Sequence, residues 1–210
     1  YKQDKFKVIS SKPLNVSIQD DPEFRTRDIL WVTGLVGKKD TLHVFVNHWP
    51  SRRGGQKESE PKRDAAARTL RTYVDILRQN PNTRIVIVGD FNDEPANRSI
   101  STTLGAIEVL RDKCNTCLYN PMFALKKEKR GSYFYQGSWD MLDQIIFTQN
   151  LAHKSYYKSD LSQVVIFQED WMMFTDEKTG KPRPNRTYAG PNYVGGYADH
   201  LPVYATLVVR

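Results

Sequence analysis

Long apolar runs are absent from the 210-residue sequence, and cysteine is scarce. No run approaches the roughly 20 apolar residues that a membrane-spanning helix needs, so we expect no membrane span. Two cysteines, Cys114 and Cys117, are too few for a disulfide-rich scaffold. A zinc site needs a second such pair or nearby histidines. We therefore interpret the pair as two loop thiols or a local disulfide, with redox chemistry as the alternative.

The sequence also lacks an initiator methionine and a recognisable signal peptide, and Tyr1 leads directly into the strand-like segment Phe6–Ser10. We expect residues 1–210 to be a single partial domain that begins inside a fold. Any signal peptide would precede Tyr1, so the sequence leaves the cellular compartment open, an extracytoplasmic one included.

The composition is that of a folded domain, with 39% apolar, 11% aromatic and 26% charged residues. The chain carries 31 lysines and arginines against 24 acidic residues, a formal net charge of +7. This balance favours anionic partners such as nucleic acid, phosphoesters or acidic lipid headgroups.

Short runs of β-branched and aromatic residues predict strands in a mixed α and β pattern. Their bounds are Phe6–Ser10, Ile29–Val36, Leu42–Asn47, Arg84–Val88, Ser132–Tyr135, Asp143–Phe147, Val164–Phe167 and Val203–Val209. One apolar stripe at helical spacing predicts a helix over Glu60–Gln79, with Ser59 as its N-cap. A shorter helix is expected over Pro95–Leu104, ended by Gly105.

Two segments without such patterns, Ser51–Ser59 and Gln168–Tyr197, predict long loops. Loops of this length in a compact domain are usually functional or disordered. The second contains aromatic residues such as Trp171, Tyr188 and Tyr193. These side chains either stack on a base, lipid or sugar, or pack the loop against the domain.

The strongest local signal is an apolar strand that leads through Gly89 to Asp90 and Asn92. The two polar residues are separated by one position, so a carboxylate and an amide can face the same side. Such a pair binds a hard cation or orients a water molecule. The same residues are also ordinary in an Asx turn that leads into a helix. The segment alone leaves both interpretations open.

Further polar groups lie at the expected ends of other strands. They are His48, the aspartates Asp140 and Asp143, and the adjacent pair Asp199 and His200. An aspartate beside a histidine can fix the imidazole tautomer and raise its basicity. His43 and His153 lack this polar company, and we assign them no role.

Together these motifs resemble those of the endonuclease/exonuclease/phosphatase superfamily, which includes the DNase I-like nucleases and several phosphatases. The shared order is a histidine at a strand end, Gly-Asp-Phe-Asn, Leu-Asp before a strand, and Asp-His-x-Pro before the last strand. Residues 47–52, Asn-His-Trp-Pro-Ser-Arg, resemble a bacterial branch. The resemblance covers most of the chain. It implies an α/β fold, a two-sheet β-sandwich flanked by helices, of which mainly the second half is present.

The resemblance implies a role for each matching residue. His200 would face the scissile phosphate, and Asp143 would be its partner, with Asp140 as the competing choice. Asp90 and Asn92 would orient the attacking water and steady the phosphate.

The remaining roles concern charge at the phosphate. His48 would contact a phosphate oxygen, and Asp199 and Asp90 would bind a metal ion. Mg²⁺ fits best, because it takes oxygen ligands and keeps several waters, and Mn²⁺ or Ca²⁺ are the alternatives. Arg52 and Arg53 follow His48 closely and would contact substrate phosphate.

Members of the superfamily carry their main metal-binding glutamate in an N-terminal half that has no counterpart in these residues. We therefore expect residues 1–210 to be catalytically incompetent alone. The inner faces of a sandwich pack on each other, so the sheet face of Ile29–Val36 and Val44–Val46 would lack its cover. The missing half or another copy of the chain would supply that cover.

The expected function is divalent-metal-dependent hydrolysis of a phosphoester. A phosphodiester of nucleic acid is the favoured substrate. One alternative is a phosphatase or phosphodiesterase that acts on a small-molecule or lipid phosphoester. The other is a non-catalytic binding fragment, against which the retained set of polar residues argues.

Overall fold

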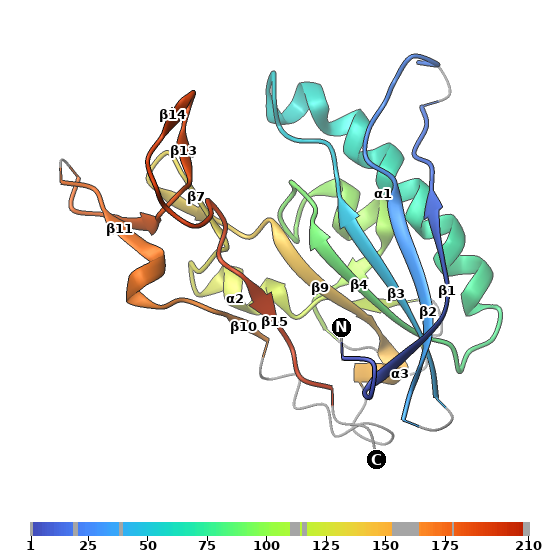
Figure 1. Ribbon diagram of the computed structural model, residues 1–210. Helices are drawn as coiled ribbons and strands as arrows, with labels where there is room; N and C mark the ends of the chain where they lie inside the picture. Colours follow the sequence, from blue (N-terminus) through green and yellow to red (C-terminus); the bar gives the residue numbers. More distant parts are fainter. Residues whose placement is uncertain are drawn as a thin grey trace.

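A computed structural model describes residues 2–18, 21–37, 40–109, 114, 117–152, 164–177 and 179–207. Its centre is a seven-stranded sheet with the order β1-β2-β3-β4-β9-β6-β5 (Figure 1). The strands are β1 (Phe6–Leu14), β2 (Ile29–Val36), β3 (Asp40–His48), β4 (Arg84–Asp90), β5 (Ala106–Ile107), β6 (Leu118–Tyr119) and β9 (Asp143–Thr148). Strands β3 and β4 are parallel, and their neighbours β2 and β9 run antiparallel to them. The expected α/β class is confirmed.

Helix α1 (Gln56–Arg78) connects β3 to β4 and covers one face of this sheet (Figure 1). Leu70 and Val74 on the helix share a buried cluster with Phe45, Ile85 and Ile87 on the two strands. All five side chains are fully buried. This packing makes β3 and β4 the rigid centre of the fold, and both strands end at the same edge.

The opposite face of the sheet is covered only in part among the described residues. Over β9, Ile145 and Phe147 pack with helix α2 (Met122–Lys127) and with the two-stranded sheet of β10 (Val165–Ile166) and β15 (Val203–Tyr204). Over β2 and β3, by contrast, Leu30 is 42% exposed and Val46 is 41% exposed. The structure is therefore a sandwich with one large sheet and one small one.

Smaller elements complete the described chain. They are the hairpin of β7 (Tyr133–Tyr135) and β8 (Ser138–Asp140), the hairpin of β11 (Met173–Thr175) and β12 (Pro182–Pro184), the hairpin of β13 (Tyr188–Ala189) and β14 (Asn192–Tyr193), the short helix α3 (Gln149–Ala152), a π-helical segment (Ser99–Leu104) and a 3₁₀ turn (Asp170–Met172). Strands β11, β13 and β14 project to one side of the molecule (Figure 1). No described helix has the length and apolarity to cross a membrane.

Every predicted strand forms, with shifts at the ends. The first strand continues to Leu14 through Pro13, because β1 is an edge strand and an edge tolerates a residue without an N–H. The last strand ends at Tyr204, and residues 208–210 lie outside the described chain. The segment Gln168–Tyr197 is not one long loop, since it forms four short strands.

The long helix begins earlier than predicted, so Ser59 is not its N-cap and the preceding loop ends at Gly55. Ser59 is buried inside the first turns, where its hydroxyl donates to the carbonyl of Gly55 at 2.5 Å. The Arg63 guanidinium donates to the Gln56 carbonyl at 2.7 Å. These contacts stabilise an additional turn that apolar periodicity cannot reveal.

The shorter predicted helix is wrong over its first half. Helical structure is confined to the π-helical segment Ser99–Leu104, and Gly105 ends it with φ 76° as predicted. The preceding residues form a turn in which the Asn97 side chain accepts a hydrogen bond from the Glu94 N–H at 2.6 Å. This local bond competes with helix formation.

Two smaller expectations concern cysteine and histidine. Cys114 and Cys117 form a disulfide, which is one of the alternatives left by the sequence. His153 lies outside the described residues. His43 faces the α1 side of the sheet, where its Nδ1 lies 3.2 Å from the Trp31 Nε1 and 3.0 Å from the Thr33 hydroxyl.

Candidate active site

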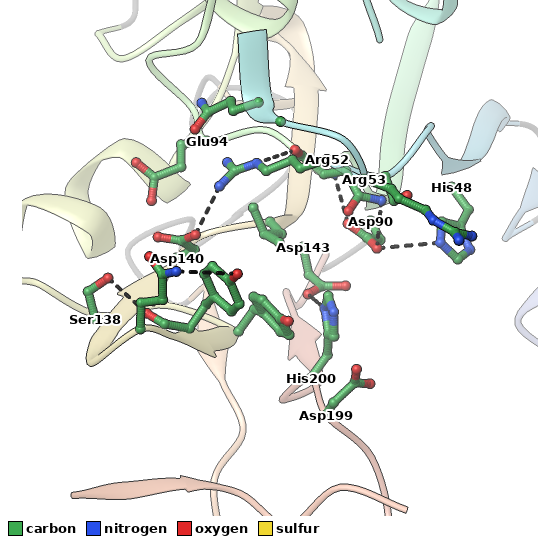
Figure 2. A pocket seen from close by; sticks show the side chains of 18 of the residues that line it. His48, Arg52, Arg53, Asp90, Glu94, Ser138, Asp140, Asp143, Asp199 and His200 are labelled. Atoms are coloured by element: carbon green, nitrogen blue, oxygen red, sulfur yellow. Dashed lines mark hydrogen bonds and ion pairs between the residues drawn. The ribbon is translucent and has the colours of Figure 1, made fainter. Parts of the chain in front are cut away.

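A cleft of about 1150 Å³ opens at the edge where β3 and β4 end. The segment before β15 and the hairpin β7–β8 form its other walls (Figure 2). The cleft is lined by all eight residues singled out from the sequence: His48, Arg52, Arg53, Asp90, Asn92, Asp143, Asp199 and His200. Residues that are distant in the sequence therefore share one polar cavity.

The parallel pairing of β3 and β4 brings His48 beside Asp90, since the two residues are register partners. The His48 Nε2 lies 3.5 Å from an Asp90 carboxylate oxygen. One step earlier, Gly89 has φ 136°, and a Cβ there would lie 1.9 Å from the Asn47 carbonyl oxygen. Only glycine fits this close approach between the strands. Gly89 thus lets the two polar strand ends meet.

Asp90 and Asn92 form a closed local arrangement. The Asn92 backbone N–H donates to Asp90 Oδ1 at 2.8 Å, and its side-chain amide donates to Asp90 Oδ2 at 3.2 Å. The same amide nitrogen donates to the Trp49 carbonyl at 3.0 Å. Asn92 has φ 50° and is largely buried. The Asx geometry and the polar site therefore coexist, and both amide hydrogens of Asn92 hold the turn rather than point into the cleft.

His200 pairs with Asp143, whose Oδ2 lies 2.6 Å from the imidazole Nδ1, and not with Asp140. Ser132 holds the two segments of the pair together with two hydrogen bonds. Its hydroxyl accepts from the Asp143 N–H at 3.0 Å, and its carbonyl accepts from the Leu201 N–H at 2.7 Å. Because Nδ1 is directed at Asp143, Nε2 is the imidazole nitrogen left for the cleft.

Opposing effects act on the protonation of the histidine. Burial by itself lowers the pKa of His200, but the hydrogen bond that its Nδ1–H donates to Asp143 and the charges of Asp143 and Asp90 outweigh burial. The pKa of His200 therefore lies above its ordinary value of 6.5. The imidazole keeps its proton to higher pH than a free histidine and can offer positive charge to an anion.

The surroundings of Asp90 disfavour its charged form. Burial raises the pKa of Asp90, the nearby charge of Asp143 raises it further, and the hydrogen bond from Asn92 partly opposes both. Ligand atoms of Asp90, Asp143 and His200 lie within 4.8 Å of one another. Two neighbouring carboxylates favour a bound cation, and carboxylate oxygens are ligands for hard divalent ions. The residues present therefore fit a divalent cation.

Asp199, predicted as a metal ligand, lines the cleft but is exposed and is not part of this cluster of ligand atoms. In Figure 2 it lies beside His200, at the outer side of the Asp143–His200 pair. Asp90 is the predicted ligand that belongs to the cluster.

The two arginines differ sharply. Arg52 is mostly buried, and its guanidinium donates to the Asn92 carbonyl at 2.8 Å and to Asp140 Oδ2 at 2.9 Å. Arg53 is exposed at the rim and has no ion pair or hydrogen bond with any described residue. Arg52 therefore fixes the turn after β4, whereas Arg53 is left for a ligand.

Sequence reasoning missed the wall opposite β3. The hairpin β7–β8 contributes Tyr133, Tyr135, Gln136 and Ser138 to the cleft. Three consecutive aromatic residues, Tyr133–Tyr135, were the available signal, but aromatic residues are common in strands without a site. Glu94 also lines the cleft.

Comparisons with known proteins identify the family and the fold. The sequence profile described as "Endonuclease/Exonuclease/phosphatase family" matches residues 1–209. Among curated proteins, no sequence matches the chain significantly. Solved structures do match in fold. The human Nocturnin catalytic domain with bound sulfate has a TM-score of 0.52 and 16% identity, and the match covers 98% of this chain and 62% of that one.

Two further structures give the same result. Humanized D. rerio TDP2 has a TM-score of 0.56 and 15% identity, covering 97% of this chain and 68% of that chain. The mannosyl-6-phosphatase Bt3783 of Bacteroides thetaiotaomicron has a TM-score of 0.53 and 16% identity, covering 99% and 69%. The chain thus spans about two thirds of the length of these structures. By the match over almost its whole length, the chain belongs to the endonuclease/exonuclease/phosphatase family.

Proposed function

We propose that the cleft hydrolyses a phosphoester with the help of a divalent cation. The observation that carries the proposal is the convergence of Asp90 and the Asp143–His200 pair, whose ligand atoms lie within 4.8 Å of one another. Phosphoryl transfer needs an aligned water, a proton acceptor and positive charge against the developing negative charge. The cleft offers a candidate for each requirement.

Each residue has a proposed task that follows from its contacts. Asp90 is held by Asn92, orients the attacking water and accepts its proton. His200 keeps its proton through Asp143 and faces a phosphoryl oxygen with Nε2. His48 contacts a second oxygen from the opposite side.

A divalent cation bound by Asp90, with Asp143 or Asp199 as a further carboxylate, would polarise the phosphoryl oxygen. Mg²⁺ suits a site with one or two carboxylates, because it retains several waters, and Mn²⁺ or Ca²⁺ are alternatives. Chelation should therefore abolish hydrolysis, and added Mg²⁺ should restore it.

The proposal has two versions, which differ in the class of substrate. The net charge of +7 supports a nucleic acid phosphodiester. The related mannosyl-6-phosphatase supports a small phosphoester. A nuclease that makes several phosphate contacts loses affinity steeply with salt, whereas an enzyme for an ester with one phosphate group does not. Rates on an oligonucleotide and on a small monoester, measured across a salt series, separate the two.

The direct test replaces the residues at the centre of the cleft in the full-length protein. We expect His200→Ala and Asp90→Ala each to lower kcat/KM by at least about 10²-fold, the range of lost acid–base or electrostatic catalysis. His43→Gln is the matched control, because His43 lies outside the cleft. Parental rates in either site variant would refute the assignment, and a fully inactive parent protein would support a non-catalytic binding role.

We also propose that further polypeptide, or a second copy of the chain, covers the exposed strip around Leu30 and Val46. Removing apolar surface from water contributes about 25 cal/mol per Å². Residues 1–210 alone should therefore self-associate. They should also lack activity, because the family resemblance places the main metal-binding glutamate outside these residues. A soluble, active monomer in a sedimentation experiment would contradict this.

A further inference from the structure

The hairpin β7–β8 presents one polar and aromatic face to the cleft. Its two-residue turn has φ 47° at Gln136 and φ 86° at Gly137, which is the left-handed turn that matches the twist of a tight hairpin. Side chains alternate across the strands, so the outer face packs Phe134 edge-on against Trp139, with ring centroids 5.2 Å apart. The cleft face carries the register partners Tyr133 with Asp140 and Tyr135 with Ser138.

The tyrosines of this face form a row that starts at the catalytic imidazole. The Tyr133 ring lies 4.7 Å from the His200 ring, and a backbone bridge joins the same two residues. The Tyr135 ring follows at 6.2 Å, with its plane inclined by 15° to that of Tyr133. Tyr135 is 53% exposed. A row of aromatic rings therefore leads from His200 into the open cleft.

Two cations on this wall already have carboxylate partners. Arg52 is paired with Asp140 at 2.9 Å. The Lys126 amino group pairs with Glu94 and donates to the Trp139 carbonyl at 2.7 Å. Ser138 and Asp140 lie at the end of the cleft opposite His48 (Figure 2). The charges of Arg52 and Lys126 on this wall are therefore paired with carboxylates, while Lys181 lies at the hairpin turn and donates to the Gly137 carbonyl at 3.2 Å.

This charge distribution bears on the size of the ligand. A strand of nucleic acid is bound by a series of cations that follow its backbone. Arg52 and Arg53 are the two arginines that line the cleft, and within the described chain Arg53 alone of these lacks a partner. Five carboxylates share the same lining: Asp90, Glu94, Asp140, Asp143 and Asp199. The cleft thus suits one phosphate and not a chain of them.

We infer that the Tyr133–Tyr135 face binds the alcohol part of the substrate, and that this alcohol carries a ring and hydroxyl groups but no second phosphate. The inference rests on the proposed phosphoesterase function. An aromatic surface stacks on the ring, while the Ser138 hydroxyl, the Gln136 amide and the tyrosine hydroxyls are partners for ligand hydroxyls. A sugar phosphate and a nucleoside 5′-monophosphate share this chemistry.

The kinetic test measures selectivity for a ring. In the full-length protein with Mg²⁺, phosphate release is followed for glucose 6-phosphate, adenosine 5′-monophosphate and the ring-free glycerol 3-phosphate. We expect Tyr135→Ala to lower the ratio of kcat/KM for a ring ester over glycerol phosphate by about tenfold, through KM. Tyr135→Phe, which keeps the ring, should retain the ratio. Tyr193→Ala is the matched control, because that tyrosine is 70% exposed outside the cleft.

The two ring esters identify the source of the ligand, and an oligonucleotide tests the opposite case. An unchanged ratio in Tyr135→Ala, or preferred hydrolysis of the oligonucleotide with a steep salt dependence, would overturn the inference. If no phosphoester is hydrolysed, the proposed function fails, and saturation-transfer NMR then tests the subsite by itself. Saturation of the ring protons of either ester, lost in Tyr135→Ala and kept in Tyr193→Ala, supports the subsite. Absence of transfer in the parent protein overturns it.

Discussion

The buried ion pair between α1 and the turn after β4 gives a sharp prediction about stability. Arg63 and Asp93 are 0% and 1% exposed, and the Arg63 Nε lies 2.7 Å from Asp93 Oδ2 without the alignment of a hydrogen bond. The guanidinium also donates to the Ser59 hydroxyl and the Gln56 carbonyl, both at 2.7 Å. Asp93 Oδ2 accepts a further bond from the Ser99 hydroxyl at 2.7 Å. Arg63 is thus the nearer of two cations that compensate this buried carboxylate, because the Arg52 Nε lies 4.0 Å from Asp93 Oδ1.

Arg63→Met leaves the Asp93 carboxylate buried, with the longer contact to Arg52 as its remaining ion pair. Removing one partner of a buried pair destabilises a protein by about 3–5 kcal/mol, a large part of the about 5–15 kcal/mol that stabilises a typical domain. Arg68→Met on the same helix is the control. Arg68 is 59% exposed and lies 3.6 Å from Asp64, which also has Arg98 at 3.6 Å and the Thr103 hydroxyl at 2.8 Å. Because Asp64 keeps these partners, we expect the loss of the exposed Arg68 to cost about 0–1 kcal/mol.

The measurement is urea unfolding, read as the free energy of unfolding at constant slope. The double variant with Asp93→Leu should regain part of the loss, because it removes the stranded charge together with its partner. Equal free energies of unfolding for the Arg63 and Arg68 variants would refute the reasoning. So would a double variant less stable than Arg63→Met.

Three further predictions concern the cleft and the sheet. Gly89→Ala should destabilise the protein by about 1–3 kcal/mol from its positive φ alone, and more from the clash with β3, which a thermal melt would detect. Arg52→Met should lower kcat and the melting temperature together, because Arg52 holds the Asn92 carbonyl. Arg53→Met should raise KM and leave the melting temperature unchanged, and identical effects of the two variants would contradict these separate roles. Burial lowers the pKa of His43 below 6.5, so on acidification the imidazole takes up a proton in the unfolded protein before it does so in the folded one. The contribution of His43 to stability should therefore be full above pH 6.5 and fall as the pH decreases toward the folded pKa. Urea midpoints at about pH 7.5 and pH 5.5 should differ less in His43→Gln than in the parent protein.

Local sequence patterns predicted the strands well, because β-branched runs such as Ile29–Val36 encode their structure directly. They also predicted the polar strand ends, since Asp90, Asn92 and His200 stand next to apolar runs in the sequence. Asp143 directly precedes the apolar run that forms β9, and this position favoured Asp143 over Asp140 as the partner of His200, as the structure has it.

Contacts between distant segments determine what the sequence did not predict. Helix α1 begins at Gln56 because the Arg63 guanidinium donates to the Gln56 carbonyl, and apolar periodicity cannot predict that hydrogen bond. Arg52 and Arg53 are equivalent in sequence, and only the fold brings Asp140 within reach of the first of them. The roles of Tyr133 and Tyr135 depend on which face of their hairpin meets His200.

The two sides of the cleft belong to parts of the molecule with different anchoring. Asp90 ends a strand in the middle of the large sheet, where it has a partner strand on each side. His200 precedes β15, which pairs over two described residues with β10, and a single bridge joins His200 to Tyr133. Segments with few backbone bonds open at lower free energy than a central strand. Amide hydrogens around Leu201 should therefore exchange much faster than those of Ile87. On heating, function should disappear while the circular dichroism of α1 is still native, so an activity half-life would report the detachment of one small segment.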